Sequence, residues 1–215
     1  MATVVLVRHG RTAANVAGVL AGRAAGVGLD EVGREQAART AERLAAAPLA
    51  AVVSSPLMRC RQTARSIIAR QTGTPETPLD RGFIEADYGT WQGRAIGELA
   101  REPLWDVVQS RPSVAEFPGG EALTAMQARA LAALRRHDHA VEQRFGPASV
   151  FAVVTHADII KSLIIDAQGR PLDEFQRIAI APASLSIVRY SGGQADVLAM
   201  NSVSGALAIP SEARR

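Results

Sequence analysis

The chain contains little cysteine and few aromatic residues, and it lacks any long apolar segment. Cys60 is the only cysteine among 215 residues, which excludes an internal disulfide framework. Aromatic residues make up 4% of the chain, so its core has to be built mainly from Ala, Val, Leu and Ile. No apolar run approaches the length of a membrane span, and no basic targeting segment precedes the first apolar run. We therefore expect a cytoplasmic protein that does not act at a membrane.

Lysine is almost absent as well, since Lys161 is the only lysine among 24 Lys and Arg residues. The formal net charge of +3 gives a weak positive field that favours anionic substrates. No basic stripe with interleaved aromatic residues is present, so a nucleic-acid partner is not expected. The length suits one domain, which we predict over residues 1–203, with a disordered tail over 204–215. The sequence shows no apolar stripe that would predict an oligomeric state.

Apolar runs and turn residues alternate along the chain in a way that predicts an α/β fold. Buried strands are expected at residues 3–7, 51–54 and 149–155, helices at 30–47, 57–71, 121–144 and 158–168, and a strand hairpin at 185–200. Strands that alternate with helices predict a three-layer α/β/α sandwich around a mostly parallel central sheet. Residues 82–120 interrupt this pattern and are expected to form a helical, lid-like excursion. We expect its aromatic side chains to form a small core of their own, although they could also offer an apolar wall to a substrate. These aromatic residues are Tyr88, Trp91, Trp105 and Phe117.

Histidine and arginine residues follow the ends of the predicted parallel strands. Arg8 and His9 follow the first strand, Arg59 lies shortly after the second, and His156 follows the third. Because the carboxyl ends of parallel strands share one edge of a sheet, we expect these four side chains to meet there. A neutral imidazole is a competent nucleophile, and the arginine fork matches the oxygens of a phosphate. The pattern therefore favours phosphoryl transfer.

Such a transfer also needs a proton donor for the leaving oxygen, and Glu85 is the best candidate. Asp87 is its competitor, two residues further on. Cys60 is not expected to act as a tyrosine-phosphatase nucleophile, because Ser66 stands where the required arginine would be. The run from His137 to His139 could bind a metal, but on a polar helix we interpret it as a solvated surface.

Six segments, taken in their order along the chain, resemble the motifs of the histidine phosphatase superfamily. They are RHGRTAAN at 8–15, GLDEVGREQA at 28–37, SSPLMRCRQTA at 54–64, EADYGTWQG at 85–93, FPGGEA at 117–122 and VTHAD at 154–158. The resemblance covers roughly residues 3–200. A lone RHG triplet would be a weak signal, but six elements in the family's order are a strong one.

The resemblance implies a role for each matching residue. His9 would be phosphorylated, and Arg8, Arg59 and His156 would bind the phosphoryl oxygens. Glu85 would protonate the leaving alcohol and then help to activate water. Asn15 would add a hydrogen bond to the phosphate or to the loop that holds it, and no metal or other cofactor is implied. Thr12, Arg23 and Glu121 are weaker candidates, each of which could serve the scaffold instead.

Two departures from the family pattern stand at Ala122 and Ala157. Ala122 replaces the serine of the family's PGGES segment, so a possible hydroxyl on the substrate side is missing. Ala157 stands where the family has glycine, which keeps the backbone N–H for phosphate but removes the freedom to adopt a positive φ. Asp158 adds a negative group that could orient His156 or bind a cationic part of the substrate. The expected partner is a small phosphomonoester.

Three functions are compatible with these residues. The first is a phosphomonoester hydrolase, and the second is a phosphoglycerate-type mutase that uses the same phosphoenzyme. Mutases of the family carry a longer insertion with extra basic residues, whereas this excursion holds only Arg94, Arg101 and Arg111, which favours the hydrolase. The third is a catalytically silent phosphate-binding or scaffold protein, and the intact set of Arg8, His9, Arg59, Glu85 and His156 argues against it.

Overall fold

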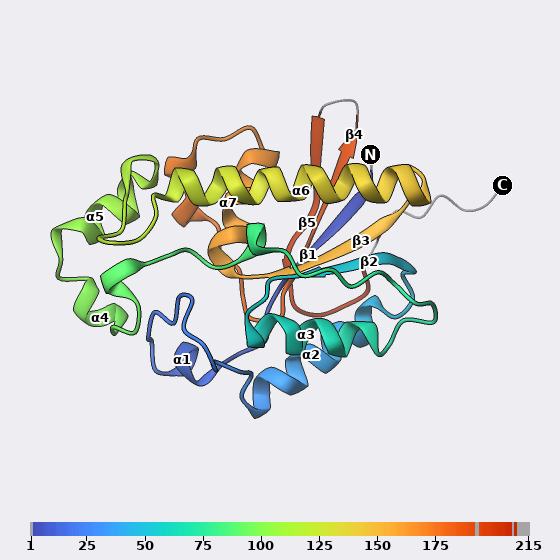
Figure 1. The fold of residues 1–215 in the computed structure, drawn as a ribbon, viewed down its shortest axis with the longest axis horizontal. Coiled ribbons are helices and arrows are strands. Elements are labelled where there is room, and N and C mark those ends of the chain that lie inside the picture. Colours follow the sequence, from blue (N-terminus) through green and yellow to red (C-terminus); the bar gives the residue numbers. More distant parts are fainter. Residues whose placement is uncertain (1, 192–193, 208, 210–215) are drawn as a thin grey trace.

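A five-stranded sheet in the order β2-β3-β1-β4-β5 forms the centre of the molecule (Figure 1). The computed structural model describes residues 2–191, 194–207 and 209. The strands are β1 (Thr3–Arg8), β2 (Leu49–Ser54), β3 (Val150–Thr155), β4 (Leu185–Ser191) and β5 (Gln194–Ser202). β1, β2 and β3 pair in parallel, whereas β4 pairs antiparallel with both β1 and β5. The sheet is thus parallel at its functional centre and mixed as a whole.

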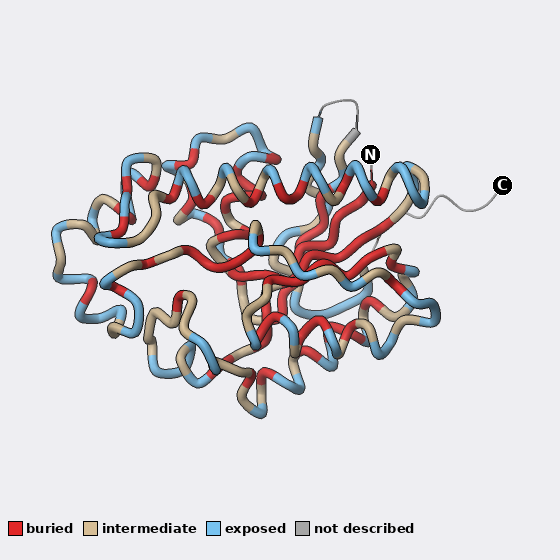
Figure 2. Tube along the Cα trace, in the orientation of Figure 1, coloured by how far each residue is buried: buried red, intermediate tan, exposed pale blue. Residues whose placement is uncertain are grey.

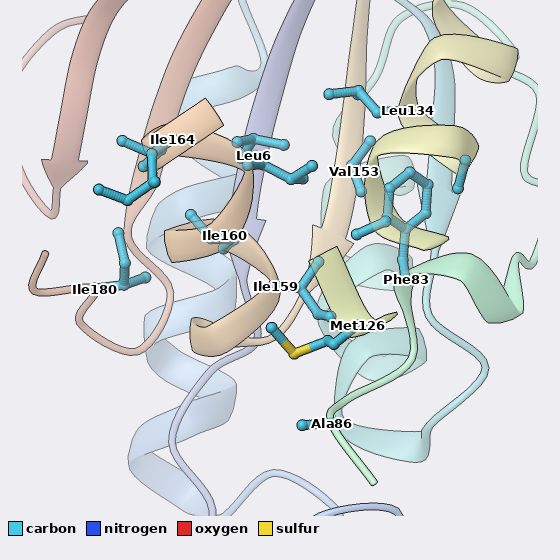
Figure 3. Close-up of a cluster of buried hydrophobic side chains, with 14 of the residues drawn as sticks. Leu6, Phe83, Ala86, Met126, Leu134, Val153, Ile159, Ile160, Ile164 and Ile180 are labelled. Atoms are coloured by element: carbon cyan, nitrogen blue, oxygen red, sulfur yellow. The ribbon is translucent and has the colours of Figure 1, made fainter. Parts of the chain in front are cut away.

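Helices cover both faces of this sheet, which confirms the three-layer sandwich. The alternation of side chains along β1 places Val5 and Val7 in one cluster, with the helices α2 (Glu31–Leu44) and α3 (Met58–Ile68). Val4 and Leu6 point to the other face, toward α6 (Leu123–Phe145) and α7 (Ala157–Ala167). The central strands are buried on both faces, as Figure 2 shows, and Figure 3 shows Leu6 and Val153 among side chains of α6 and α7.

The excursion over residues 82–120 is a chain of short helical segments beside the main body (Figure 1). They are η1 (Arg81–Phe83), η2 (Gly89–Trp91), α4 (Ile96–Leu99), α5 (Pro103–Ser110) and η3 (Pro112–Val114). The Trp91 ring lies 5.5 Å from Phe117 and 6.2 Å from Trp105, measured between ring centroids. Tyr88, Trp91 and Phe117 belong to the same hydrophobic cluster as Leu6, and Trp105 packs against it. The expectation of a separate small core was therefore wrong, because these aromatic side chains extend the main core into the excursion.

The remaining segments connect these layers. The short helix α1 (Ala13–Val16) follows β1, and η4 (Leu172–Arg177) follows α7. Ile178 and Ile180 carry the chain back to the carboxyl edge of the parallel strands before β4 begins, so β4 has to run antiparallel to β1. No helix in the described part of the chain is long and apolar enough to cross a bilayer.

The predicted tail lies partly within the described residues. Ser204 and Gly205 accept hydrogen bonds from the guanidinium of Arg43, and Leu207 packs against the core. Residues 208 and 210–215 lie outside the described part of the chain. Residues 204–207 thus lie against the body of the domain.

Candidate active site

The carboxyl ends of the three parallel strands bring the predicted histidines and arginines together. β1 ends at Arg8 and pairs with the end of β3, so His9 and His156 follow neighbouring strands. Their ring centroids are 5.3 Å apart. Arg59 reaches the same place from the first turn of α3. A cavity of about 500 Å³ opens here, lined among others by Arg8, His9, Thr12, Asn15, Gly22, Arg59, Glu85, Tyr88, Ala157, Asp158, Lys161 and Gln176.

The hydrogen bonds of His9 determine which ring nitrogen is free to react. Nδ1 lies 2.8 Å from the carbonyl oxygen of Gly10, which can only accept, so Nδ1 carries the proton. Nε2 therefore holds the lone pair, and the Nε–H of Arg59 donates to it at 3.2 Å. Burial, together with the charges of Arg59 and Arg8, holds the pKa of His9 well below its usual value. His9 is thus a neutral imidazole whose Nε2 carries a lone pair, the form in which an imidazole can act as a nucleophile.

His156 is fully buried and is also neutral. Arg59 Nη2 donates to Nδ1 at 3.2 Å, which leaves the proton on Nε2 for the hydroxyl of Ser55 at 2.8 Å. Burial and then the charge of Arg59 hold the pKa of His156 well below its usual value. Ser55, the second residue of the SSP turn after β2, thereby fixes the ring orientation of His156.

Two guanidinium nitrogens at this site are buried without a hydrogen-bond partner in the described structure. They are Nε of Arg8 and Nη1 of Arg59. Both side chains also make hydrogen bonds: Arg8 Nη1 donates to the carbonyl of Ile180, and Arg59 Nη2 donates to that of Gly22 at 2.8 Å. Leaving a buried charged donor unpaired is costly, and an anion in the cavity would satisfy both groups. The site is therefore built to hold an anion.

The start of α7 adds backbone N–H groups to this anion site. Ala157 is the first residue of the helix and lines the cavity, and His156 is the N-cap. Helix N-termini favour anions through their free N–H groups and dipole. Ala157 is helical and is not among the described residues with positive φ. Alanine therefore takes the place of the family's glycine without backbone strain.

Glu85 is the carboxylic acid that the structure brings to the site. Its Oε2 lies 3.7 Å from Nδ1 of His156, and its Oε1 accepts a hydrogen bond from the N–H of Ala86 at 3.0 Å. Burial and the nearby charge of Asp158 raise the pKa of Glu85 to about 7. The carboxyl can thus hold a proton near neutral pH. Asp87, the competitor, forms an ion pair with Arg23 at 2.8 Å and does not line the cavity.

A buried network holds the backbone of Glu85 in place. Arg23 Nε donates to the carbonyl of Glu85 at 2.9 Å, and Arg129 Nη2 donates to the same oxygen at 3.2 Å. Both arginines also bind the carboxylate of Glu121. Although burial opposes this, the hydrogen bonds from Arg129 hold the pKa of Glu121 below its usual value. Arg23 and Glu121 therefore belong to the scaffold of the acid rather than to the phosphate cradle.

Thr12 and Asn15 form a reciprocal cap at the start of α1. Asn15 N–H donates to Thr12 Oγ1 at 3.2 Å, and the N–H of Thr12 donates to Asn15 Oδ1 at 3.1 Å. Both residues line the cavity. The cap shapes the loop after His9 and leaves the Asn15 side chain exposed at its rim.

Cys60 and the run from His137 to His139, which we did not assign to the site from the sequence, have structural environments that can be described. Burial raises the pKa of the Cys60 thiol to about 12, which removes it as a nucleophile. In the helix α6, His137 bonds Asp80 and Asp138 bonds the N–H of Ala2, while His139 is exposed. Within the described residues, no group of three or more potential ligands could hold a metal ion.

Three side chains at this site were not predicted from the sequence. Arg129 lies in the middle of α6, and its role depends on carbonyls from a distant segment, so no local pattern marks it. Lys161 and Gln176 line the outer part of the cavity, and only the uniqueness of Lys161 in the composition could have pointed to it.

Comparison with known proteins agrees with this geometry. The chain is 35% identical over 168 residues to phosphoglycerate mutase-like protein 4 of Arabidopsis thaliana, covering 75% of this chain and 69% of that protein. It is 28% identical over 203 residues to phosphoserine phosphatase 1 of Hydrogenobacter thermophilus, covering 94% and 92%. It spans about half, 52%, of the bifunctional protein Rv2228c of Mycobacterium tuberculosis, at 32% identity over 199 residues, which are 91% of this chain.

The fold is also that of solved relatives. YhfR of Bacillus stearothermophilus superposes with a TM-score of 0.85 at 28% identity, covering 95% of this chain and 98% of that one. The family model of the histidine phosphatase superfamily (branch 1) matches residues 4–203. With the paired histidines, the arginines and the buried acid at one sheet edge, this match shows that the chain belongs to the histidine phosphatase superfamily.

Proposed function

We propose that this chain hydrolyses phosphomonoesters through a phosphohistidine on His9. The Nε2 lone pair of His9 attacks phosphorus, the P–O bond to the alcohol breaks, and Glu85 gives its proton to the leaving oxygen. The Glu85 carboxylate then takes a proton from water, whose oxygen attacks phosphorus and breaks the N–P bond. Phosphate leaves with the histidine and the carboxylic acid regenerated.

The observation that carries this proposal is the pairing of one nucleophile with two unpartnered cationic donors. Nε2 of His9 faces Arg59, and Arg8 and Arg59, which both line the cavity, each have one buried N–H group without a hydrogen-bond partner. Phosphoryl transfer depends mainly on positioning and on stabilising charge at the equatorial oxygens. Arg8 and Arg59 supply that charge and those donors here, so the proposal requires no metal.

The positions of the three arginines in the excursion favour hydrolysis over the phosphoglycerate-type mutase reaction. Arg94 is paired with Glu102, whereas Arg101 and Arg111 are exposed. None of these three described side chains lines the cavity, so none is placed to hold the carboxylate of an acceptor. This placement supports water as the acceptor.

The test is phosphate release from a panel of phosphomonoesters that includes 3-phosphoglycerate, with a chelator present. We expect turnover that disappears in His9→Ala, with p-nitrophenyl phosphate as the reference ester. Formation of 2-phosphoglycerate from the 3-isomer without phosphate release would instead assign the mutase. Phosphate binding without either reaction would assign a silent binding protein.

A further inference from the structure

Two residues other than glycine adopt a positive φ in the described part of the chain. Ala183, just before β4, has φ 57°, and Asn201, near the end of β5, has φ 54°. A left-handed backbone is unfavourable for alanine, and it persists where the surrounding structure enforces it, which is often at functional sites. Neither residue lines the active-site cavity, so any role in the reaction has to be indirect.

Ala183 belongs to a tight turn over residues 181–184, which we call the return turn. The N–H of Ser184 donates to the carbonyl of Ala181 at 3.1 Å and closes the turn. Pro182 holds the second position and Ala183 the third, which is the pattern of a type II turn. The third position of such a turn favours glycine because its φ is positive. The return turn is therefore held in a shape that Ala183 opposes.

The return turn and the residue before it contact both residues at the end of β1. The N–H of Ala183 donates to the carbonyl of His9 at 3.1 Å, and the N–H of Arg8 donates to the carbonyl of Ser184 at 3.1 Å. The carbonyl of Ile180 accepts a hydrogen bond from Nη1 of Arg8. These contacts fix the backbone of the proposed nucleophile and orient the guanidinium whose buried Nε–H has no partner in the described structure.

Two side chains from distant elements hold the return turn. Thr40 in α2 is buried, and its Oγ1 donates to the carbonyl of Ala183 at 2.7 Å. Asn201 accepts the N–H of Ala181 on its Oδ1 at 2.6 Å, while its own N–H donates to the Ser186 hydroxyl at 3.1 Å. The pairing of β4 with β5 shifts register at this point, so Asn201 lies in a β-bulge. Such a bulge re-aims a side chain, here toward the turn.

We propose that Thr40 and Asn201 are positioning residues of the active site, which act through the return turn. Thr40 holds the strained Ala183, whose N–H orients the backbone of His9. Asn201 holds the start of the turn, next to the carbonyl that binds Arg8. Neither side chain touches the substrate. The inference rests on the proposed phosphatase function, since it concerns the nucleophile and the phosphate ligand of that reaction.

Thr40→Val removes the hydroxyl and keeps the shape of the side chain. We expect kcat for p-nitrophenyl phosphate to fall about 10- to 100-fold, because a small displacement of the nucleophile misaligns it with phosphorus. Thr40→Ser, which keeps the hydroxyl, should keep a kcat near that of the wild type. A Thr40→Val protein that is folded by circular dichroism and keeps its kcat overturns the assignment of Thr40.

Ala183→Gly distinguishes positioning from general support of the fold. Glycine adopts a positive φ without strain, so the turn then keeps its shape without the Thr40 hydroxyl. Added to Thr40→Val, it should restore most of the lost kcat, and a double variant as slow as Thr40→Val overturns the inference. The matched control is Ser162→Ala, which removes another buried hydroxyl that bonds a carbonyl, that of Ile159, and should leave kcat unchanged.

Asn201 lies on the edge strand and tests the inference even if Thr40→Val does not fold. Asn201→Gly permits the same left-handed backbone but removes the acceptor for the turn, whereas Asn201→Asp keeps an acceptor of the same shape. We expect Asn201→Gly to raise the Kd of inorganic phosphate, measured by calorimetry, about 3- to 10-fold, because Arg8 is less well aligned. Asn201→Asp should leave this Kd near the wild-type value. Equal Kd values for Asn201→Gly and the wild type overturn the assignment of Asn201.

The two proposals fail in different ways. If hydrolysis of p-nitrophenyl phosphate is absent, or survives in His9→Ala, the proposed function fails. If that hydrolysis depends on His9 but Thr40→Val and Asn201→Gly behave as the wild type, the positioning role fails alone.

Discussion

Burial acts on His9 and Glu85 in opposite directions: near neutral pH it keeps the imidazole neutral and keeps a large share of the carboxyl protonated. It lowers the pKa of the imidazole, helped by Arg59 and Arg8, and raises the pKa of the carboxyl to about 7, helped by Asp158. In the proposed mechanism, the imidazole therefore keeps its lone pair while the carboxyl can keep its proton. Burial at one site thus suits both of the proposed roles.

The pH dependence of turnover should follow Glu85. With an alkyl phosphate, we expect kcat/KM to fall as pH rises through about 7, because the protonated acid of the free protein is lost there. Glu85→Gln should lower kcat/KM by about 100- to 10,000-fold and remove this alkaline limb. The kcat/KM for p-nitrophenyl phosphate, whose leaving group needs no proton, should be much less affected. An alkaline limb that persists unchanged in the variant would show that another group is the acid.

Among single residues, those that directly follow a predicted strand could be placed in the site from the sequence. Arg8, His9 and His156 could be placed because the ends of parallel strands converge, and Arg59 because it opens the helix after β2. Arg129 could not be placed, since its partners are the carbonyls of Gly82, Ile84 and Glu85, which only the fold brings to α6.

At the scale of helices and strands, close backbone contacts hold the loop that follows His9 in place. Gly10, directly after His9, lies so near α2 that an added Cβ would come within 2.4 Å of the carbonyl oxygen of Gly33. A Cβ on Gly33 would come within 2.0 Å of the carbonyl oxygen of Arg11. Both glycines therefore allow α2 to touch the loop that carries the nucleophile.

Gly33→Ala should destabilise the protein although alanine is the better helix former. The clash is with backbone, so we expect the free energy of unfolding to fall by about 1–3 kcal/mol in urea titrations. Gly97→Ala in α4 is the matched control, because nothing lies within 4 Å of its added Cβ. That control should gain about 0.5–1 kcal/mol. Equal effects of the two substitutions would contradict the close-contact interpretation.

The link between α6 and the acid segment is the second element-scale device. Arg129→Met removes the donors to the carbonyls of Ile84 and Glu85 and one cation of Glu121. We expect a loss of about 1–3 kcal/mol in unfolding free energy, together with a lower kcat for alkyl phosphates. Arg135→Met, an exposed position on the same helix, should change neither. A variant that loses stability but keeps its full kcat would show that Arg129 does not position Glu85.

The order of helices and strands could be predicted from the sequence, but the pairing of β4 with β1 could not. The hairpin at β4 and β5 carries strong strand and turn signals, yet its position beside β1 depends on the return of residues 178–180 to the carboxyl edge. No local pattern specifies that return. The parallel part of the sheet, on which the site depends, was correctly anticipated.

At the scale of the whole molecule, the cavity joins segments from across the chain. Arg8 comes from β1, Arg59 from α3, Glu85 from the excursion and Ala157 from α7 (Figure 1). A ligand that bridges them binds only the folded state. Anion binding should therefore stabilise the entire domain rather than one loop.

Inorganic phosphate at 100 times its Kd should raise the unfolding free energy by about 2.7 kcal/mol. Thermal or urea unfolding with and without phosphate, at matched ionic strength in chloride, measures this effect. Arg59→Met should lose most of the stabilisation, because it removes the contacts to His9 and His156 as well as one unpartnered donor. Equal stabilisation of both proteins would place the phosphate elsewhere.

The most direct test of the central claim is to trap the phosphoenzyme. The protein is mixed with a phosphomonoester and quenched in base within one turnover, and its mass is measured intact and by peptide, since a phosphohistidine survives alkali and is lost in acid. We predict one added phosphoryl group on the peptide that contains His9, and none in His9→Ala. A protein that turns over substrate yet carries no phosphoryl group, or carries it on another residue, would contradict the proposed role of His9.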